Sequence, residues 1–257
     1  MLPREHGAWA VLAAPILVGF AAAGGGSWGI VLAFVCAALG GFCLRTPLQA
    51  LLSPAPPAGA GAWLAVYALL AAAGAGVLFL RYERWSLLAF ALPAGAALAF
   101  NLRQNLSRKA LSLPNEIVGI AALCLGAPAA HYAGGGELSL TSAVVWTISF
   151  LYFVGPVFHV KMAALQHRAA SDPACGPALE GMRRRGLAYH GASLGAVGAG
   201  ALAGLVPWFA VLPFLAALEK NRRRGTARPG KVNFKSLGYQ EAGYSVVFVL
   251  AVAAGYR

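Results

Sequence analysis

Long apolar segments separated by short polar gaps dominate the chain. A helix needs about 20 mainly apolar residues to cross the hydrocarbon core of a bilayer, and most of these segments approach that length. The pattern predicts an all-α, polytopic membrane helix bundle of about nine transmembrane helices, folded as a single domain over residues 1–257. The nine segments cover residues 8–24, 27–44, 61–80, 85–100, 115–133, 139–158, 186–203, 205–218 and 238–256.

The composition supports a membrane protein and excludes several other classes. Hydrophobic residues make up 59% of the chain and charged residues 11%, whereas a soluble domain carries about 25% charged residues. So little charge would not keep the surface of a soluble enzyme hydrated, and so apolar a chain would not stay disordered. The 4 cysteines have no paired spacing, which argues against a disulfide-rich secreted domain.

Basic residues gather on one side of the predicted membrane. With nine spans, 17 of the 20 Lys and Arg residues fall with the N-terminus and the even-numbered gaps. The positive-inside rule then puts the N-terminus in the cytoplasm and the C-terminus outside. We expect a multi-pass membrane protein whose basic gaps contact anionic lipids. A nucleic-acid partner is not expected, because the basic residues do not form a polar face with interleaved aromatics.

The longer gaps lie on the predicted cytoplasmic side and hold the candidate functional residues, since long loops often carry function. Before the first segment, Arg4-Glu5-His6 either anchors the chain at the membrane surface or contacts a substrate. After the second segment, Pro47 is expected to break the helix. Arg45, just before it, either snorkels to the membrane surface or binds a ligand.

The gap after the fourth segment is the richest in polar side chains. If the fourth helix continues, Asn101, Asn105 and Arg108 share one face at i, i+4 and i+7, which indicates a wet cavity rather than lipid contact. Glu116 follows in the first turn of the next helix, where it either complements the helix dipole or pairs with a cation. The cations near it in the sequence are Arg103, Arg108 and Lys109.

Two further residues, His159 and Lys161, follow the sixth segment. Both are candidates for contacts to a ligand or a phosphate, and the alternative for His159 is a satisfied residue at a helix interface. His159 and His167 point about 80° apart on a helix, which is poor geometry for one metal ion. The sequence has no CxxC or HExxH motif, so it predicts no metal site.

Three features of the C-terminal third have simpler interpretations. The basic run 220–224 is interpreted as an orientation signal that contacts anionic lipids. Glu241 lies inside the last apolar segment and therefore needs a partner or a cavity. The pairs Gly191/Gly195 and Gly200/Gly204 have the spacing that lets helices approach closely.

Three segments of sequence carry a family resemblance. They are Pro3-Arg-Glu-His-Gly-Ala-Trp-Ala-Val-Leu-Ala-Ala-Pro-Ile-Leu-Val-Gly19, Leu113-Pro-Asn-Glu-Ile-Val-Gly-Ile120 with Ala127-Pro128, and Leu237-Gly-Tyr-Gln-Glu241. They resemble the YwiC-like bacterial membrane proteins. More distantly, the entry to the first segment and Arg108 through Gly119 resemble the UbiA superfamily of intramembrane prenyltransferases. That resemblance implies nine helices, a cytoplasmic N-terminus and long cytoplasmic loops after helices two, four and six.

The chain departs from that superfamily where its Asp-rich motifs would hold Mg²⁺ on a prenyl diphosphate. The two places read Cys43-Leu-Arg45-Thr-Pro-Leu-Gln49 and Phe158-His-Val-Lys161-Met-Ala-Ala-Leu-Gln-His167, and Asp172 is the single Asp in the sequence. Since Mg²⁺ needs hard oxygen ligands, we expect no Mg²⁺ site and predict no other cofactor. An anionic head group is instead expected to bind Arg and Lys directly.

These observations favour a protein that binds an anionic amphiphile, such as a prenyl phosphate, a quinone precursor or a haem-like ligand, in a cytoplasm-facing cavity. Divergent prenyl transfer stays open, with no catalytic residue assigned. The alternative is a non-enzymatic accessory or assembly subunit of a membrane complex. The residues expected to bind the ligand in one central pocket are Arg45, Asn101, Arg103, Asn105, Arg108, Lys109, Glu116, His159 and Lys161.

Overall fold

Helices account for every regular element in residues 1–3, 6–135 and 137–256, the ranges that the computed structural model describes. Arg4 and Glu5, two of the candidate residues, lie outside these ranges. The α-helices are α1 (His6–Ala22), α2 (Trp28–Leu51), α3 (Ala60–Leu80), α4 (Leu88–Leu106), α5 (Leu113–Cys124), α6 (Gly126–Gly135), α7 (Leu140–Ala169), α8 (Gly176–Leu202), α9 (Val211–Thr226) and α10 (Phe234–Gly255). Three short 3-10 helices are η1 (Trp85–Leu87), η2 (Pro173–Cys175) and η3 (Trp208–Ala210).

Many of these helices have the length and composition of membrane spans. Within the described ranges, six helical segments are long and apolar enough to cross a bilayer. They are α2, α3, η1 with α4, α5 with α6, α7 and α10. Each predicted apolar segment contains helix, and the fifth is divided between α5 and α6. The chain is therefore a membrane-type helical protein, while nine spans and the orientation of the termini stay predictions.

The chain divides into two compact units, Met1–Trp146 and Thr147–Arg257. The first unit contains α1 to α6 and the first residues of α7. The second contains the rest of α7 together with α8, α9 and α10. The single domain expected over residues 1–257 stays a prediction.

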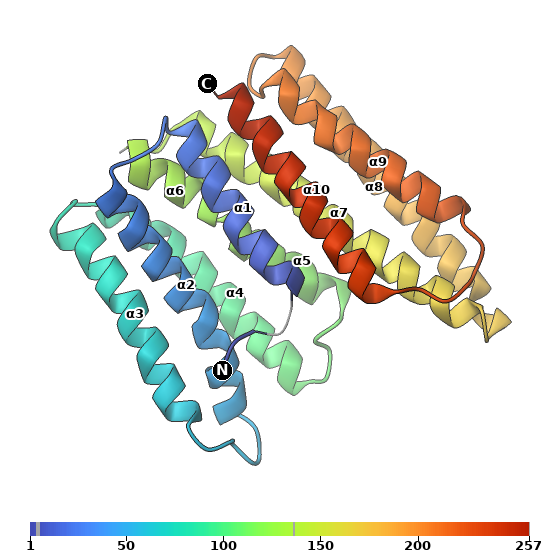
Figure 1. Cartoon of the computed structure of the whole chain (residues 1–257), viewed down its shortest axis with the longest axis horizontal. Helices are drawn as coiled ribbons and strands as arrows, with labels where there is room; N and C mark the ends of the chain where they lie inside the picture. The colour runs from blue at the N-terminus through green and yellow to red at the C-terminus, as the bar shows by residue number, and fades with distance from the viewer. Residues whose placement is uncertain (4–5, 136, 257) are drawn as a thin grey trace. The chain divides into compact units, whose positions relative to one another are not determined.

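Close contact between helix backbones holds the first unit together, most extensively between α2 and α3 (Figure 1). A Cβ atom added at Gly40 of α2 would collide with the backbone of α3, and one added at Gly74 of α3 would collide with the backbone of α2. Gly19 has the same role between α1 and α6. In a membrane protein, helix association depends on such close van der Waals packing because lipid supplies no hydrophobic driving force.

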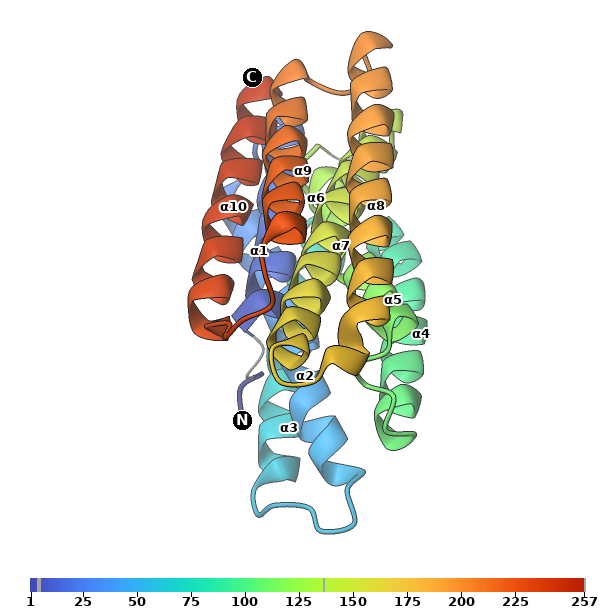
Figure 2. The same cartoon turned by 90° about the vertical axis from the view of Figure 1, so that its right-hand side faces the viewer.

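Aromatic rings form the core of the second unit, where α9 lies beside both α8 and α10 (Figure 2). The rings of Tyr152 in α7 and Phe248 in α10 stack with centroids 4.2 Å apart. Phe214 of α9 meets Tyr152 edge to face at 5.6 Å. Such pairs add about 0.5–1.5 kcal/mol each to the burial of the rings. Tyr152 also donates a hydrogen bond to the carbonyl of Tyr244 at 2.8 Å, so α7, α9 and α10 are joined at one point.

Three helices extend further than the apolar pattern predicts. Pro47 does not break α2, which continues to Leu51. Likewise α7 continues to Ala169 and α9 to Thr226, so the residues 159–169 and 219–226 are helical rather than loop. The physical reason is that hydropathy marks only the part of a helix that meets lipid, whereas Ala, Leu, Arg, Lys and Glu continue a helix beyond it.

The glycine spacing on α8 does not mark a helix contact. Within the described chain, a Cβ atom at Gly191 or Gly195 would meet no other group within 4 Å. Gly200 lies against the side chain of Val206, and Gly204 has a φ of +70° in the turn after α8. A left-handed φ is one that glycine adopts readily, so Gly204 serves the turn and not helix packing.

Candidate functional site

A cavity of about 500 Å³ lies within the first unit, between α2 and parts of α1, α3, α4, α5 and α6. Its wall is almost entirely apolar, and the polar side chains among the described residues that line it are Arg45 and Asn101. Arg45 lies in the C-terminal part of α2 and Asn101 in that of α4. The two helices run in the same direction, because α3, which comes between them in chain order, runs back in the opposite direction (Figure 1). The cavity is therefore polar at one end and apolar along the rest.

Asn101 is well fixed at this polar end. It is 7% exposed, and its Nδ2 donates a hydrogen bond to the carbonyl of Ala97, one turn back in α4, at 3.1 Å. A Cβ atom on Gly119 of α5 would lie 3.3 Å from Asn101 Oδ1. The glycine thus leaves room for the amide against α5. Asn101 therefore lines the cavity with its amide fixed by a hydrogen bond within its own helix.

A second, more polar compartment of about 410 Å³ shares Phe42 and Arg45 with the apolar cavity. Its other lining residues are Met1, Leu2, Pro3, Thr46 and Gln49. Two hydrogen bonds fasten the N-terminal segment beside it. Tyr67 of α3 donates to the carbonyl of Met1 at 2.8 Å, and Trp9 of α1 donates to the carbonyl of Pro3 at 3.3 Å. Arg45 therefore stands where a polar compartment meets an apolar one.

The remaining candidates from the gap after α4 are spread over a turn. Arg108 does not share a face with Asn101 and Asn105, because α4 ends at Leu106 and Arg108 has a φ of 55°. Asn105 is half-buried on α4, and its Nδ2 has no hydrogen-bond partner within the described chain. The cations Arg103, Arg108 and Lys109 are exposed.

Glu116 is half-buried in the first turn of α5. This is the location at which a carboxylate complements the helix dipole. The dipole interpretation of Glu116 therefore agrees with the helix boundaries. Pairing of Glu116 with one of the neighbouring cations stays a prediction.

The second unit contains a different kind of polar cluster, which buries an ion pair. Lys220 of α9 donates to both carboxylate oxygens of Glu241 in α10, at 2.8 Å to Oε1 and 2.6 Å to Oε2. The two side chains are 9% and 13% exposed. The Lys220 ammonium also lies 4.5 Å from the centre of the Tyr244 ring, a cation–π contact. Glu241 thus has the partner that its place in an apolar segment requires.

His159 of α7 borders this pair. It is 2% exposed, and its Nε2 lies 3.8 Å from Glu241 Oε1. Neither ring nitrogen has a hydrogen-bond partner within the described chain. Lys161, two residues further along α7, is half-buried.

Two further buried polar residues, His190 and Asn221, lie on α8 and α9 of the same unit. His190 Nδ1 lies 2.7 Å from the carbonyl of Gly186 in its own helix α8. A Cβ atom on Gly155 of α7 would lie 2.8 Å from His190 Nε2, and one on Gly186 would lie 3.0 Å from Asn221 Oδ1. Two glycines therefore make the space that these polar side chains occupy between α7, α8 and α9.

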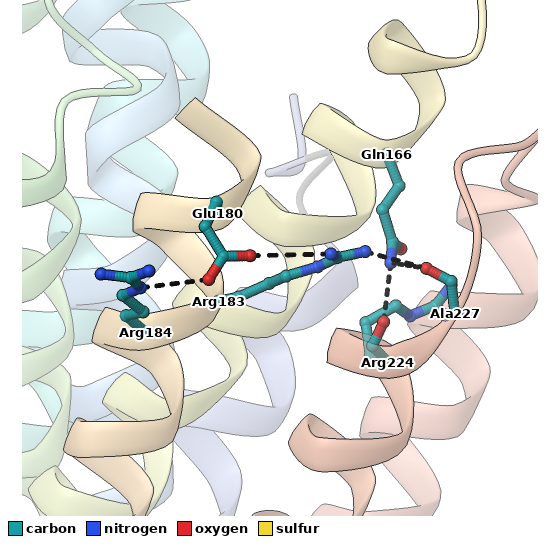
Figure 3. Close-up of polar contacts among 6 residues, drawn as sticks. All are labelled: Gln166, Glu180, Arg183, Arg184, Arg224 and Ala227. Atoms are coloured by element: carbon teal, nitrogen blue, oxygen red, sulfur yellow. Dashed lines mark hydrogen bonds and ion pairs between the residues drawn. The ribbon is translucent and has the colours of Figure 1, made fainter. Parts of the chain in front are cut away.

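Side chains from α7 and α8 hold the C-terminal end of α9 (Figure 3). Gln166 of α7 is 1% exposed and donates to the carbonyl of Arg224 at 2.6 Å and to that of Ala227 at 3.3 Å. Arg183 of α8 also donates to the Ala227 carbonyl, at 3.0 Å. The last carbonyls of a helix have no partner within it, so these donors fix the start of the basic segment after α9.

Exposed ion pairs surround this basic end. Glu180 accepts a hydrogen bond from Arg184 at 3.1 Å. Glu219 accepts from Arg222 and Arg223 at 2.7 Å each. Hydrogen bonds from these two guanidinium groups lower the pKa of Glu219 from 4.5 to about 2. The basic run after the eighth apolar segment is therefore only partly a free cationic surface, since Lys220 is buried and two of its arginines share a carboxylate.

The nine predicted site residues fall in both units. Arg45 and Asn101 line the cavity, whereas His159 and Lys161 belong to the second unit. That all nine line one central pocket stays a prediction. Sequence reasoning did not single out His190 and Asn221. His190 is a single imidazole in an otherwise mostly apolar part of α8, and Asn221 lies within the basic run 220–224, so neither carries a distinct local signal.

In the part of the chain that the structure describes, no three His, Cys, Asp or Glu side chains come together as a metal site would need. The expectation that Mg²⁺ is not bound stays a prediction, and the donors at Arg45, Thr46 and Gln49 suit an anion rather than a cation.

A family model for the YwiC-like proteins matches residues 2–131. The matched range contains every residue that lines the cavity and its polar compartment, except Met1. No curated protein and no solved structure matches the chain. The match covers half of the sequence, and the chain belongs to the YwiC-like family.

Proposed function

We propose that the first unit binds an anionic amphiphile, with its head group at Arg45 and its apolar part in the 500 Å³ cavity. One observation carries this proposal. Arg45 lines both an apolar cavity and a polar compartment, which matches the two parts of an amphiphile.

The chemistry of the polar compartment favours an anion. Arg45, Thr46 and Gln49 follow one another on α2 at i, i+1 and i+4, and all three can donate hydrogen bonds. No carboxylate lines either compartment among the described residues. An Arg guanidinium binds carboxylate or phosphate through two parallel hydrogen bonds. Direct contacts of this kind would hold the head group without Mg²⁺.

The apolar cavity supplies affinity for the rest of the molecule. Since a lipid-soluble ligand leaves hydrocarbon when it enters the cavity, its apolar part would be held by van der Waals packing against Leu, Ala and Phe. Candidate ligands are a prenyl phosphate, a quinone precursor or a haem-like carboxylate. Membrane lipids can reach such a cavity directly, so the ligand need not be soluble. We expect the protein to work in the bacterial inner membrane, with its basic end against anionic lipids.

Ligand retention in a native mass spectrum of the full chain, released from mild detergent, tests the proposal. We expect a retained species in the parent protein and a roughly tenfold or greater loss of it in Arg45→Ala, because a charged hydrogen bond contributes about 1.5–3 kcal/mol. Arg223→Ala, which removes an exposed cation of the second unit, is the matched control and should retain the ligand fully.

A second variant tests the apolar part of the site separately. Gly41 lines the cavity, and a Cβ atom there would meet nothing within 4 Å in the described chain. Gly41→Leu should therefore fill the cavity without disturbing the helices and displace the ligand. Gly76→Leu on α3, which also has open space but does not line the cavity, is its control. Retention of the same species in both Arg45→Ala and Gly41→Leu would contradict the proposal.

The accessory-subunit alternative predicts a different result. An assembly factor would copurify with a larger membrane complex at fixed stoichiometry, and its cavity would carry no retained species. Prenyl transfer is a third outcome. It would appear as transfer of an isoprenoid chain from a labelled prenyl diphosphate to an aromatic acceptor by the parent protein, lost in Arg45→Ala.

A further inference from the structure

The buried cluster of the second unit places one carboxylate between two nitrogen bases. Glu241 Oε1 lies 2.8 Å from Lys220 Nζ and 3.8 Å from His159 Nε2. The three groups come from three helices, α10, α9 and α7. A carboxylate that is hydrogen-bonded to an ammonium and lies near an imidazole can pass a proton from the first to the second once it reaches the ring.

Burial makes this arrangement costly as a purely structural device. Two charges removed from water lose several kcal/mol of hydration each, and replacing such a pair by apolar residues is often neutral or stabilising. Polar residues inside membrane-type helices pair with one another and commonly mark proton relays. The buried pair therefore points to a function rather than to stability alone.

His159 carries the stronger indication. It is 98% buried, yet neither of its ring nitrogens has a hydrogen-bond partner in the described chain. Buried polar atoms without partners are rare and call for an explanation such as a proton, water or catalytic role. A neutral imidazole offers one donor and one acceptor, so His159 can receive a proton at Nε2 while Nδ1 keeps the opposite role.

We propose that Lys220, Glu241 and His159 form a proton relay within the second unit. In the starting state Lys220 is an ammonium, Glu241 a carboxylate and His159 a neutral ring. The proton leaves Nζ for Oε1, and the carboxyl then gives it to Nε2 of His159. Lys220 ends as a neutral amine, Glu241 as a carboxylate and His159 as an imidazolium, so the net charge of the cluster is unchanged.

The distances set what must move. The contact between Lys220 and Glu241 is already a hydrogen bond, whereas the 3.8 Å between Oε1 and Nε2 must close by about 1 Å for proton transfer. The Glu241 carboxyl can make this motion by rotating away from Lys220. The relay is therefore a competition between Lys220 and His159 for one carboxylate.

Burial and the surrounding charges together set which base holds the proton. The charged or titratable groups around the buried His159 are Lys220, Arg224, His190 and Glu241. The centre of the Tyr244 ring lies 4.5 Å from the Lys220 ammonium, and Tyr152 donates a hydrogen bond to the Tyr244 carbonyl. Removing the Lys220 charge therefore takes away the nearest repulsion and leaves His159 as the cation that Glu241 can pair with.

The relay predicts opposite effects from two changes. In Lys220→Met, the proton affinity of His159 should rise at least tenfold, about one pH unit, because Glu241 is left with a single partner. In the double variant Lys220→Met/Glu241→Gln, which removes both charges of the pair, the affinity should return to the parent value within about threefold. A packing role without electrostatic coupling to the pair would leave the titration of His159 the same in all three proteins.

The measurement is ¹⁵N NMR of the full chain in lipid nanodiscs with all 5 histidines labelled. The signals of His159 are assigned by their loss in His159→Gln, and exposed His167 serves as the reference in the same spectrum. Glu180→Gln, which removes an exposed carboxylate of the same unit, should leave His159 unchanged. Where Lys220→Met does not fold, Lys220→Gln keeps a hydrogen-bond donor to Glu241 and should give the same rise.

A His159 titration that is the same in the parent, the Lys220 variant and the double variant would overturn the relay. A rise that persists in the double variant would overturn it as well, because the carboxylate would then have no part in holding the proton. The proposal is independent of ligand binding in the first unit, and Arg45→Ala should leave the titration unchanged.

Discussion

The two units place polar groups in apolar surroundings in opposite ways. The first unit sets Arg45 and Asn101 at one end of an apolar cavity, beside a space that a ligand can fill. The second packs Lys220, Glu241, His159 and His190 against one another. Polar groups beside a cavity select what enters it, whereas polar groups packed together depend on each other. Substitutions should therefore affect ligand retention in the first unit and stability in the second.

The largest difference is expected from breaking the buried ion pair. Glu241→Ala leaves the Lys220 ammonium buried without its carboxylate, which should cost about 3–5 kcal/mol of unfolding free energy. Arg45→Ala should cost about 1 kcal/mol or less, because it removes a half-buried side chain beside a cavity. Reversible unfolding of the full chain in mixed micelles measures both. Equal losses in the two variants would remove the distinction between the units.

Glycine substitutions sharpen the same comparison through packing. Gly155→Ala should destabilise by about 1–3 kcal/mol, since its Cβ would lie 2.8 Å from the buried His190 ring and overpacking costs that much. Gly41→Ala enters open space on a helix and should stabilise by up to about 1 kcal/mol through helix propensity. Unfolding midpoints of the two variants should move in opposite directions. A shift of the same sign in both would contradict the assigned environments.

The contacts that end α9 should have an intermediate effect. Gln166→Leu fills a similar volume but leaves the carbonyl of Arg224 without its buried donor, which should cost about 1–3 kcal/mol. The segment after Ala227 should then be cut faster by a protease. Ser171→Ala, which removes a hydroxyl from an exposed turn, provides the baseline. Unchanged proteolysis in Gln166→Leu would mean that Arg183 alone holds this end.

The smallest effect concerns the exposed carboxylate of the second unit. Because the pKa of Glu219 is lowered from 4.5 to about 2, its pairing with arginine contributes fully above pH 4.5 and is lost as the pH falls through about 2. A ¹³C titration of labelled Glu residues should show Glu219 still ionised at pH 3. Replacing Arg222 and Arg223 by Gln should return its midpoint toward 4.5. A parent midpoint already at 4.5 would show that these surface contacts do not persist in solution.

The sequence predicted elements better than it predicted their ends and their partners. Each apolar segment contains helix, because burial in lipid demands a continuous apolar run that hydropathy detects. The need of Glu241 for a partner was also visible, since a carboxylate in such a run is expensive. The identity of that partner, Lys220, could not be predicted, because the basic run 220–224 has the composition of a loop that contacts lipid. Lys220 is buried only because α9 continues beyond the apolar segment.

The site in the first unit was predicted in part for the same reason. Arg45 and Asn101 stand out as polar residues at helix ends, and both line the cavity. Arg108 was assigned to the same face on the assumption of a continuous helix, which a left-handed residue ends. The cavity itself depends on how small residues of five helices pack, and no local pattern records it.

The close approach of Gly155 to His190, and of Gly186 to Asn221, has a consequence for how this sequence can drift. In each pair a glycine on one helix leaves the space that a ring or an amide from another helix fills. A larger residue at the glycine position would therefore collide, and a smaller residue at the other position would leave a void. Accepted changes should therefore arise as linked pairs, with a larger residue at 155 accompanied by a smaller one at 190. In descendants of this gene, positions 155 and 190 should carry a shared mutational history, as should 186 and 221.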